Sequence, residues 1–320
     1  MIAATNHFID RTFEEEAEEL KSQPKLNSSD SQADLNSQLS HLCYNIAQAK
    51  VKGDADLEAS LTASYRKFSD KDPGFITCAT TYAKYYALYR GVLKYNSWQD
   101  NGGLNYGVIN YKLPNDAKVA VIGDWGTGME DAACLLQTLL NTHQPDVIVH
   151  LGDIYYSGTP DECAANYSQI FDTAFQKYGK RLPVFTIPGN HDYYAFGYGY
   201  YEMVTAMNSF LPAAVQEASY FCLRTEDNGW QFLGMDTGYN DANPADQFNT
   251  YYAGPQLNAS EITWHKDKLD NFEGATLLFS HHQMYSHHAK LNGSLSSYGS
   301  YPNLNKYLLD VFRPYFNGKV

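Results

Sequence analysis

The chain has 320 residues, of which 36 are Asp or Glu and 23 are Lys or Arg, so its formal net charge is -13. Such a chain repels a phosphate backbone or an anionic membrane unless a local basic patch intervenes. Nucleic acid and membrane surfaces are therefore excluded as expected partners. Hydrophobic residues make up 44% of the chain, which is enough for one large domain plus a smaller one.

Targeting signals and cysteines indicate the compartment. The first twenty residues have no basic start followed by an apolar segment, and no run of about eighteen apolar residues occurs. The sequence therefore predicts a cytoplasmic protein, with export by another route left open. Scattered cysteines in neither a CxxC pair nor an even set predict reduced, mostly buried thiols; they are Cys43, Cys78, Cys134, Cys163 and Cys222.

Residues 1–112 predict a small all-α region. It begins with an acidic segment at 14–19, expected to be a solvated helix, followed by a polar linker near 21–32. Apolar residues at helical spacing then predict three helices, around 35–46, 57–68 and 82–89. The last of these carries a stripe of tyrosines that favours packing against neighbouring helices, with docking of a protein partner as the alternative.

In residues 113–320 the pattern changes to strands that alternate with helices. Short apolar runs that each end at a polar cluster are typical of buried strands in a parallel or mostly parallel sheet. Open α/β sheets place ligands beyond the carboxyl ends of such strands, so we expect the clusters to converge at one edge of the sheet. The runs are 119–122, 147–151, 184–187, 231–235 and 275–279.

The clusters contain the ligand types that a pair of metal ions requires. Two cations about 3.5 to 4 Å apart need a shared anionic ligand and further hard oxygen or imidazole donors. A bridging carboxylate offsets charge on both ions, while an amide oxygen coordinates without adding negative charge. The candidates are Asp124, Asp153, Tyr156, Asn190 and His281. In contrast, His150 and Asp236 lie within or after strands without a neighbouring ligand type, which favours structural roles.

Four motifs carry a family resemblance. Gly-Asp-Trp-Gly at 123–126, Gly-Asp-Ile-Tyr-Tyr at 152–156, Gly-Asn-His-Asp at 189–192 and Leu-Phe-Ser-His at 278–281 resemble the first four signature blocks of the calcineurin-like metallophosphoesterase superfamily. The chain looks most like the purple acid phosphatase branch, because Tyr156 stands three residues after an aspartate, where that branch carries an iron-binding tyrosine. The resemblance implies an α/β fold, an αββα sandwich of mixed sheets preceded by the small all-α region.

The resemblance also implies roles for the ligands. Asp124, Asp153 and Tyr156 would hold the first metal ion, and Asp153, Asn190 and His281 the second, with Asp153 as the bridge. Iron is expected on the Tyr156 side, and iron, zinc or manganese at the second site.

Further histidines are implied at the substrate. His191 would lie beside the phosphate, stabilising charge or protonating the leaving group, and one of His282, His287 or His288 would share that role. The Gly and Tyr alternation at 193–201 follows His191 directly and predicts an aromatic wall of the site, with a surface loop as the alternative.

The predicted function is therefore phosphomonoester hydrolysis by a metal-activated hydroxide, acting on a phosphorylated small molecule or a phosphoprotein. The alternatives are a catalytically impaired binding or regulatory protein, with a partner on the N-terminal helices, and a phosphodiesterase of the same superfamily. The superfamily's last block, Gly-His-X-His, is not found, and residues 317–320 look like the turn before it. The domain at 113–320 is thus expected to be incomplete at its C-terminus and to hold its ions weakly.

Overall fold

The computed structural model describes residues 38–66, 74–245, 255–285 and 305–320. The chain forms two compact units, residues 1–77 with 129–136 and residues 78–128 with 137–320. The sequence predictions at 14–19 and 21–32 lie outside the described residues, as do His287 and His288.

The three helices predicted for the N-terminal region are present. They are α2 (Gln38–Lys52), α3 (Ala55–Arg66) and α4 (Gly74–Tyr89). The turn between α2 and α3 contains Gly53, whose φ of 71° is accessible without strain only to glycine. The Asp54 carboxylate accepts a hydrogen bond from the Leu57 amide and so starts α3.

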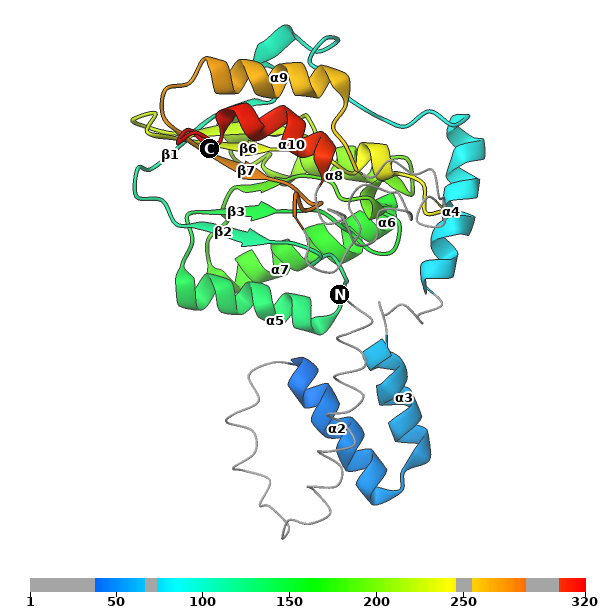
Figure 1. Ribbon diagram of the computed structural model, residues 1–320. Helices are drawn as coiled ribbons and strands as arrows, with labels where there is room; N and C mark the ends of the chain where they lie inside the picture. The colour runs from blue at the N-terminus through cyan, green and yellow to red at the C-terminus, as the bar shows by residue number, and fades with distance from the viewer. Residues whose placement is uncertain (1–37, 67–73, 246–254, 286–304) are drawn as a thin grey trace. The chain divides into compact units, whose positions relative to one another are not determined.

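The strands divide between two sheets (Figure 1). A parallel sheet contains β2 (Val119–Ile122), β3 (Val147–His150) and β4 (Val184–Thr186) in that order. The second sheet has the order β1-β5-β6-β7 and is mixed, because β5 and β6 are antiparallel whereas the other pairs are parallel. Its strands are β1 (Val108–Leu113), β5 (Phe221–Thr225), β6 (Trp230–Gly234) and β7 (Ala275–Phe279).

This arrangement corrects one expectation from the sequence. The polar clusters do not all follow strands of a single sheet, since β2, β3 and β4 belong to one sheet and β6 and β7 to the other. Two strands were also missed. β1 lies across position 112, the predicted boundary of the all-α region, and β5 joins β6 in a hairpin.

The layers form an αββα sandwich, which confirms the predicted fold class. Apolar side chains of both sheets, among them Val149, Phe185 and Phe221, pack together between the sheets. A second core lies between the mixed sheet and the helices α9 (Ala259–Asp270) and α10 (Lys306–Phe312). The helix α7 (Gln169–Tyr178) covers the other face of the parallel sheet (Figure 1).

Other connections follow their local sequence. The helix α6 (Pro160–Cys163) begins at Thr159 with the predicted capping box, in which Thr159 and Glu162 each bond the other's backbone amide. A π-helical turn links α6 to α7. The remaining helices are α5 (Glu130–Thr138) and α8 (Tyr198–Met207). Near the start of β7, the Thr276 amide donates to the Lys319 carbonyl oxygen at 2.8 Å.

The predicted aromatic wall at 193–201 is wrong for most of its tyrosines. Tyr193, Tyr200 and Tyr201 are at most 1% exposed and belong to the core. Small residues make this packing possible, because a Cβ on Gly199 would lie 2.4 Å from the Gly158 carbonyl oxygen. The Gly and Tyr alternation therefore brings α8 close to a neighbouring loop and does not line a cleft.

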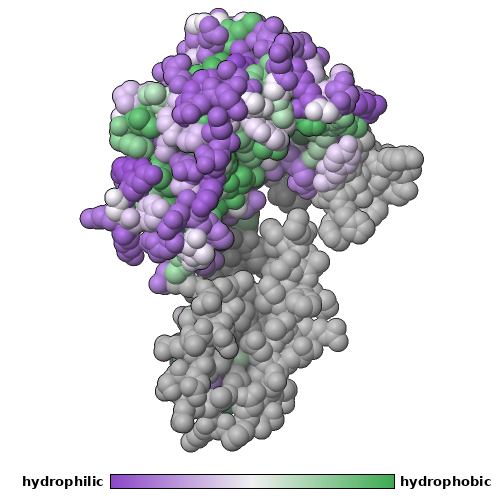
Figure 2. Space-filling view, turned by 90° about the vertical axis from the view of Figure 1, so that its left-hand side faces the viewer, coloured by the Kyte–Doolittle hydropathy of each residue, from purple (hydrophilic) through white to green (hydrophobic). Residues whose placement is uncertain are grey.

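The surface carries mostly hydrophilic residues on the face shown in Figure 2, with hydrophobic residues gathered in a strip between them. Large apolar side chains that remain exposed include Val121 on β2, Trp230 on β6 and Leu277 on β7. Four described cysteines carry reduced thiols, as predicted, and of these only Cys134 is exposed. Within the described ranges, no helix combines the length and the apolar character needed to cross a bilayer.

Candidate metal centre

Three predicted ligands meet where strands of the two sheets end. Asp124 and Asp153 follow β2 and β3 of the parallel sheet, whereas His281 follows β7 of the mixed sheet. Each of the three offers a ligand atom, and these atoms all lie within 4.8 Å of one another. The predicted convergence is therefore observed for these three of the five candidate ligands, and it needs both sheets.

The backbone at both aspartates is in the left-handed region. The φ angle is 53° at Asp124 and 68° at Asp153, a conformation that costs free energy for a residue with a side chain and is often found at functional sites. A glycine of the loop after β4, Gly189, allows this loop to approach Asp153 and His281 closely. A Cβ on Gly189 would lie 2.1 Å from Asp153 Oδ1 and 2.8 Å from His281 Nε2. The ligand atoms thus surround a backbone position that has no room for a side chain.

The imidazole of His281 is oriented by a second partner. Its Nδ1 lies 2.8 Å from the Leu151 carbonyl oxygen, and because a carbonyl only accepts, Nδ1 carries the proton. Its Nε2 lies 3.5 Å from Asp153 Oδ2. An imidazole whose other nitrogen donates to a backbone carbonyl is the usual arrangement of a histidine that binds a metal ion.

The charges of this cluster depend on one another. Burial raises the pKa of Asp124, and the neighbouring Asp153 raises it further. Burial also disfavours the Asp153 carboxylate, but His281 and His191 outweigh this effect and hold the pKa of Asp153 below its ordinary value. Burial opposes the charged form of His281 too, yet Asp153 and Asp124 raise its pKa. Positive charge at this point therefore stabilises both carboxylates.

Asn190 is held at the same edge by a tyrosine. Its Nδ2 donates to the Tyr194 hydroxyl at 2.6 Å. This bond fixes the amide so that its carbonyl oxygen points away from Tyr194. Tyr194 is 7% exposed, and its ring centroid is 4.6 Å from that of His191. Of the predicted aromatic wall, Tyr194 is the residue that contacts the site.

The Tyr155 hydroxyl reaches the carboxylates. It donates to Asp124 Oδ1 at 2.9 Å. Tyr156, the predicted iron ligand, contributes its backbone: its amide donates to Glu162 Oε1 at 2.7 Å and its carbonyl accepts from Cys78 and His191. Two adjacent tyrosines follow Asp153, and the sequence alone favoured the second because of the family spacing.

The two predicted catalytic histidines have different surroundings. The Nδ1 of His191 lies 2.5 Å from the Tyr156 carbonyl oxygen, so Nδ1 carries a proton and Nε2 is the nitrogen that exchanges one. In His282 both ring nitrogens are engaged, Nδ1 with Thr237 Oγ1 at 2.9 Å and Nε2 with Asp241 Oδ2 at 3.0 Å. These contacts hold the His282 ring in place, and its catalytic role stays a prediction.

Asp192 is a residue that the sequence reading did not single out. Its carboxylate accepts from the amides of Asp153, Ile154 and Gly189, at 2.8, 3.2 and 2.7 Å. In return, Asp153 Oδ1 accepts from the His191 amide at 3.1 Å. Burial and the nearby Asp153 raise the pKa of Asp192 to about 7, although three donors favour its charged form. The residue ties the loops after β3 and β4 together, and its place in the Gly-Asn-His-Asp motif was the available signal.

A second group of buried acids lies under α9. Asp236 and Glu261 are fully buried, and the Asp236 amide donates to Glu261 Oε1 at 2.8 Å. The Tyr193 hydroxyl donates to Asp236 Oδ2 at 2.6 Å, while His265 Nε2 and the Tyr95 hydroxyl contact Glu261. Asp236 is thus structural, as the sequence predicted. His150 is also buried, with Nδ1 3.0 Å from Thr186 Oγ1.

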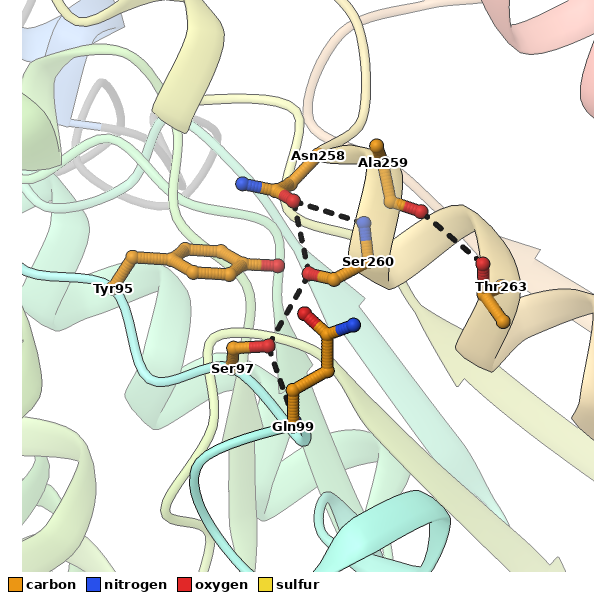
Figure 3. A pocket seen from close by; sticks show the side chains of 7 residues that line it. All are labelled: Tyr95, Ser97, Gln99, Asn258, Ala259, Ser260 and Thr263. Carbon is orange, nitrogen blue, oxygen red and sulfur yellow. Dashed lines mark hydrogen bonds between the residues drawn. The ribbon is translucent and has the colours of Figure 1, made fainter.

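An open hollow of about 400 Å³ lies at the start of α9 and is separate from the cluster of Asp124 (Figure 3). Its polar groups bond one another. Asn258 Oδ1 accepts from the Ser260 amide and hydroxyl, and the Ser97 hydroxyl donates to Ser260 Oγ. Because these contacts cap the helix and join it to the segment of Tyr95, the hollow is a feature of the helix start.

The fold and the cluster define a class of protein, an αββα sandwich with a metal-ligand group at the carboxyl ends of its strands. A family model of calcineurin-like phosphoesterases matches residues 117–315, and the chain belongs to that family. A search of curated proteins finds no match. Two carboxylates and an Nδ1-protonated imidazole within 4.8 Å are a donor set that suits a divalent or trivalent ion. The residues present therefore fit the metal ions that this family binds, and the chain is a metal-dependent phosphoesterase in this general sense.

Proposed function

We propose that this protein hydrolyses phosphomonoesters at a dinuclear metal site. Asp124, Asp153 and His281 would hold the ions together with the Asn190 carbonyl oxygen and a tyrosine. The observation that carries the proposal is the convergence of three ligand atoms from β2, β3 and β7 within 4.8 Å. When bound, the ions activate water and offset negative charge on the phosphate.

The chain's own residues supply the remaining steps. Asp153, whose Oδ2 lies 3.5 Å from His281 Nε2, is the candidate bridge between the ions. His191 delivers a proton from Nε2 to the leaving oxygen, because its Nδ1 is already committed to the Tyr156 carbonyl. Tyr155 and Tyr194 both contact the His191 ring, with centroids 4.7 and 4.6 Å away. These contacts limit the movement of the ring while a substrate binds.

The substrate class follows from charge. The net charge of -13 disfavours a nucleic acid, so a phosphorylated small molecule or a phosphoprotein is the proposed substrate.

A phosphatase assay tests the proposal. Protein supplied with iron, zinc or manganese should release phosphate from an aryl monoester. With an alkyl monoester, whose leaving oxygen needs a proton, His191→Ala should lower turnover by about 10² to 10⁴ with metal content intact. Parallel assays with a bis-aryl diester distinguish a phosphodiesterase. Stoichiometric metal binding without turnover on either substrate would instead indicate the catalytically impaired binding protein.

The colour of the protein tests whether a tyrosine binds iron. A phenolate bound to ferric iron gives a visible charge-transfer band, which zinc and manganese as divalent ions do not give. Family spacing assigns this bond to Tyr156, whereas the hydroxyl that contacts Asp124 is that of Tyr155. We expect the colour of an iron-loaded sample to persist in one of Tyr155→Phe and Tyr156→Phe and to disappear in the other. Iron without colour in the wild-type protein would contradict a tyrosine ligand of either kind.

A further inference from the structure

The peptide group that joins Tyr156 to Ser157 is held on both sides by side chains. On one side, Glu162 accepts from the amides of Tyr156 and Ser157, at 2.7 and 3.1 Å. On the other side, the Tyr156 carbonyl oxygen lies 3.2 Å from Cys78 Sγ and 2.5 Å from His191 Nδ1. One backbone oxygen therefore accepts from a thiol of α4 and from the candidate proton donor.

Cys78 suits the role of a hydrogen-bond donor. It is 2% exposed, so the bond to the carbonyl is shielded from competing water. Burial raises the pKa of its thiol to about 11, which keeps the donor hydrogen in place at neutral pH. A distance of 3.2 Å is short for sulfur and oxygen, and the corresponding contact of Cys163 with the Gly158 carbonyl is longer, at 3.6 Å.

Aromatic contacts bring α4 close to the chain segment that follows His191. Tyr82 and Tyr86 contact the ring of Phe196, with centroids 5.2 and 6.1 Å away, and Tyr89 stacks on Tyr198 at 3.6 Å. Phe196 and Tyr198 follow His191 closely in the chain. The tyrosine stripe of α4 thus packs against the segment that carries His191, and Cys78 is the residue of this helix that contacts the carbonyl bound by the imidazole.

We propose that Cys78, together with Glu162, positions His191 by fixing the Tyr156 carbonyl that binds its Nδ1. This inference rests on the proposed function, in which His191 protonates the leaving oxygen. The carbonyl accepts the Nδ1 proton and so directs the transferable proton to Nε2. If the peptide group rotates, the Tyr156 carbonyl no longer points at Nδ1 of His191. The imidazole then has no fixed acceptor, and its transferable proton is no longer directed to Nε2. Cys78 and Glu162 are positioning residues, since each acts through the Tyr156 peptide.

Leaving-group dependence separates positioning from general damage to the fold. An alkyl phosphate needs protonation of its leaving oxygen, whereas p-nitrophenyl phosphate expels a stable anion. Cys78→Ala should lower kcat between about 2- and 10-fold for the alkyl ester, the range of one lost hydrogen bond, with little change for the aryl ester. Glu162→Gln should lower it about 10- to 100-fold with the same selectivity. Cys78→Ser keeps a donor and should restore turnover.

Cys222→Ala is the matched control. Its thiol is also fully buried and lies 3.7 Å from Gln231 Oε1 in the mixed sheet, away from His191. Any loss in this variant should be equal for both esters. An equal loss of both activities in Cys78→Ala, without rescue by Cys78→Ser, would overturn the proposal.

A second readout does not depend on turnover. Nitrogen-15 NMR of histidine-labelled, metal-free protein reports which ring nitrogen carries the proton. Wild-type His191 should show a protonated Nδ1, while Cys78→Ala should show a mixture of tautomers. If the wild-type protein hydrolyses neither ester, the proposed function fails, and the NMR result still decides the positioning. An unchanged tautomer in Cys78→Ala would show that Cys78 has no such role.

Discussion

Two groups of acids in this protein differ in what surrounds their oxygens. Under α9, the carboxylates of Asp236 and Glu261 are met by donors from the protein, among them the Tyr193 hydroxyl and the amide of Tyr239. At the strand ends, Asp124 and Asp153 instead share one small volume with the imidazole of His281. The first group is complete without a ligand, whereas the second gathers negative charge that a cation stabilises. Convergence of ligand atoms, more than burial of acids, distinguishes a metal site.

The largest expected effect concerns Asp153. Asp153→Asn preserves the shape and the left-handed backbone but removes the charge, so we expect loss of bound metal and phosphatase activity below detection. Metal analysis of purified protein and an aryl phosphate assay measure both. The corresponding change in the other group, Asp236→Asn, should leave metal content intact. Equal metal binding in Asp153→Asn and wild type would remove the distinction between the two groups.

Asp192→Asn should weaken metal binding about 10- to 100-fold, the usual effect of changing a residue that supports ligands. The amide nitrogen of an asparagine would face backbone donors of Asp153 and Gly189 that now bond the carboxylate. Isothermal titration with manganese or zinc measures the affinity. Asp172→Asn is a suitable control because Asp172 lies on the exposed face of α7, where it pairs with Arg181. Unchanged affinity in Asp192→Asn would show that the loops hold their positions without it.

The pH dependence of stability tests the group of acids at α9. Burial raises the pKa of Glu261 to about 8, against the hydrogen bonds from the Asp236 amide and the Tyr95 hydroxyl, which lower it. The folded state therefore binds a proton that the unfolded state releases near pH 4. Stability from this group is present below pH 4 and is lost as the pH rises through about 8. Between pH 5 and 8, wild type should lose on the order of 2 kcal/mol that Glu261→Gln retains, because a glutamine does not ionise.

Urea unfolding at several pH values measures this slope. The exposed residue Glu217 provides the control, since Glu217→Gln should follow the wild-type slope. A Glu261→Gln protein with the full wild-type slope would mean that Glu261 does not cause the pH dependence.

The smallest expected effect concerns the orientation of Asn190. Tyr194→Phe removes the hydroxyl that accepts from Asn190 Nδ2, and the amide can then rotate. We expect turnover to fall between about 2- and 10-fold, the range of a single hydrogen bond. Tyr198→Phe, which leaves the stacked ring in place on Tyr89, should have wild-type kinetics. Equal kinetics in both variants would show that Asn190 is fixed by other contacts.

The sequence predicted the strand-end ligands because a motif and a hydrophobic run both pointed to them. Asp124, Asp153 and His281 each follow such a run directly, and strand ends place side chains at the same edge. The sorting of those strands into two sheets was not predictable, since an apolar run does not show which other run it pairs with. His281 therefore reaches the site from an unexpected sheet.

The contacts that support the ligands could not be predicted from the sequence, for a different reason. Whether Tyr155 or Tyr156 directs its hydroxyl to Asp124 depends on backbone torsions that residue spacing does not determine. Asp192 and Cys78 act on backbone groups, and a backbone amide or carbonyl leaves no trace in the sequence. Contacts of this kind become visible only when segments far apart in the chain are placed together.

The left-handed backbone at Asp124 and Asp153 has a consequence for how this family changes during evolution. Among residues with side chains, asparagine and aspartate adopt such φ angles most readily, and glycine does so without strain. A single nucleotide change converts an aspartate codon into an asparagine codon. A lineage can therefore abandon ion binding at these positions while it keeps its fold, and can regain it by the reverse change. We expect inactive descendants to carry asparagine or glycine at these two positions, and an efficient enzyme with asparagine at both would contradict this expectation.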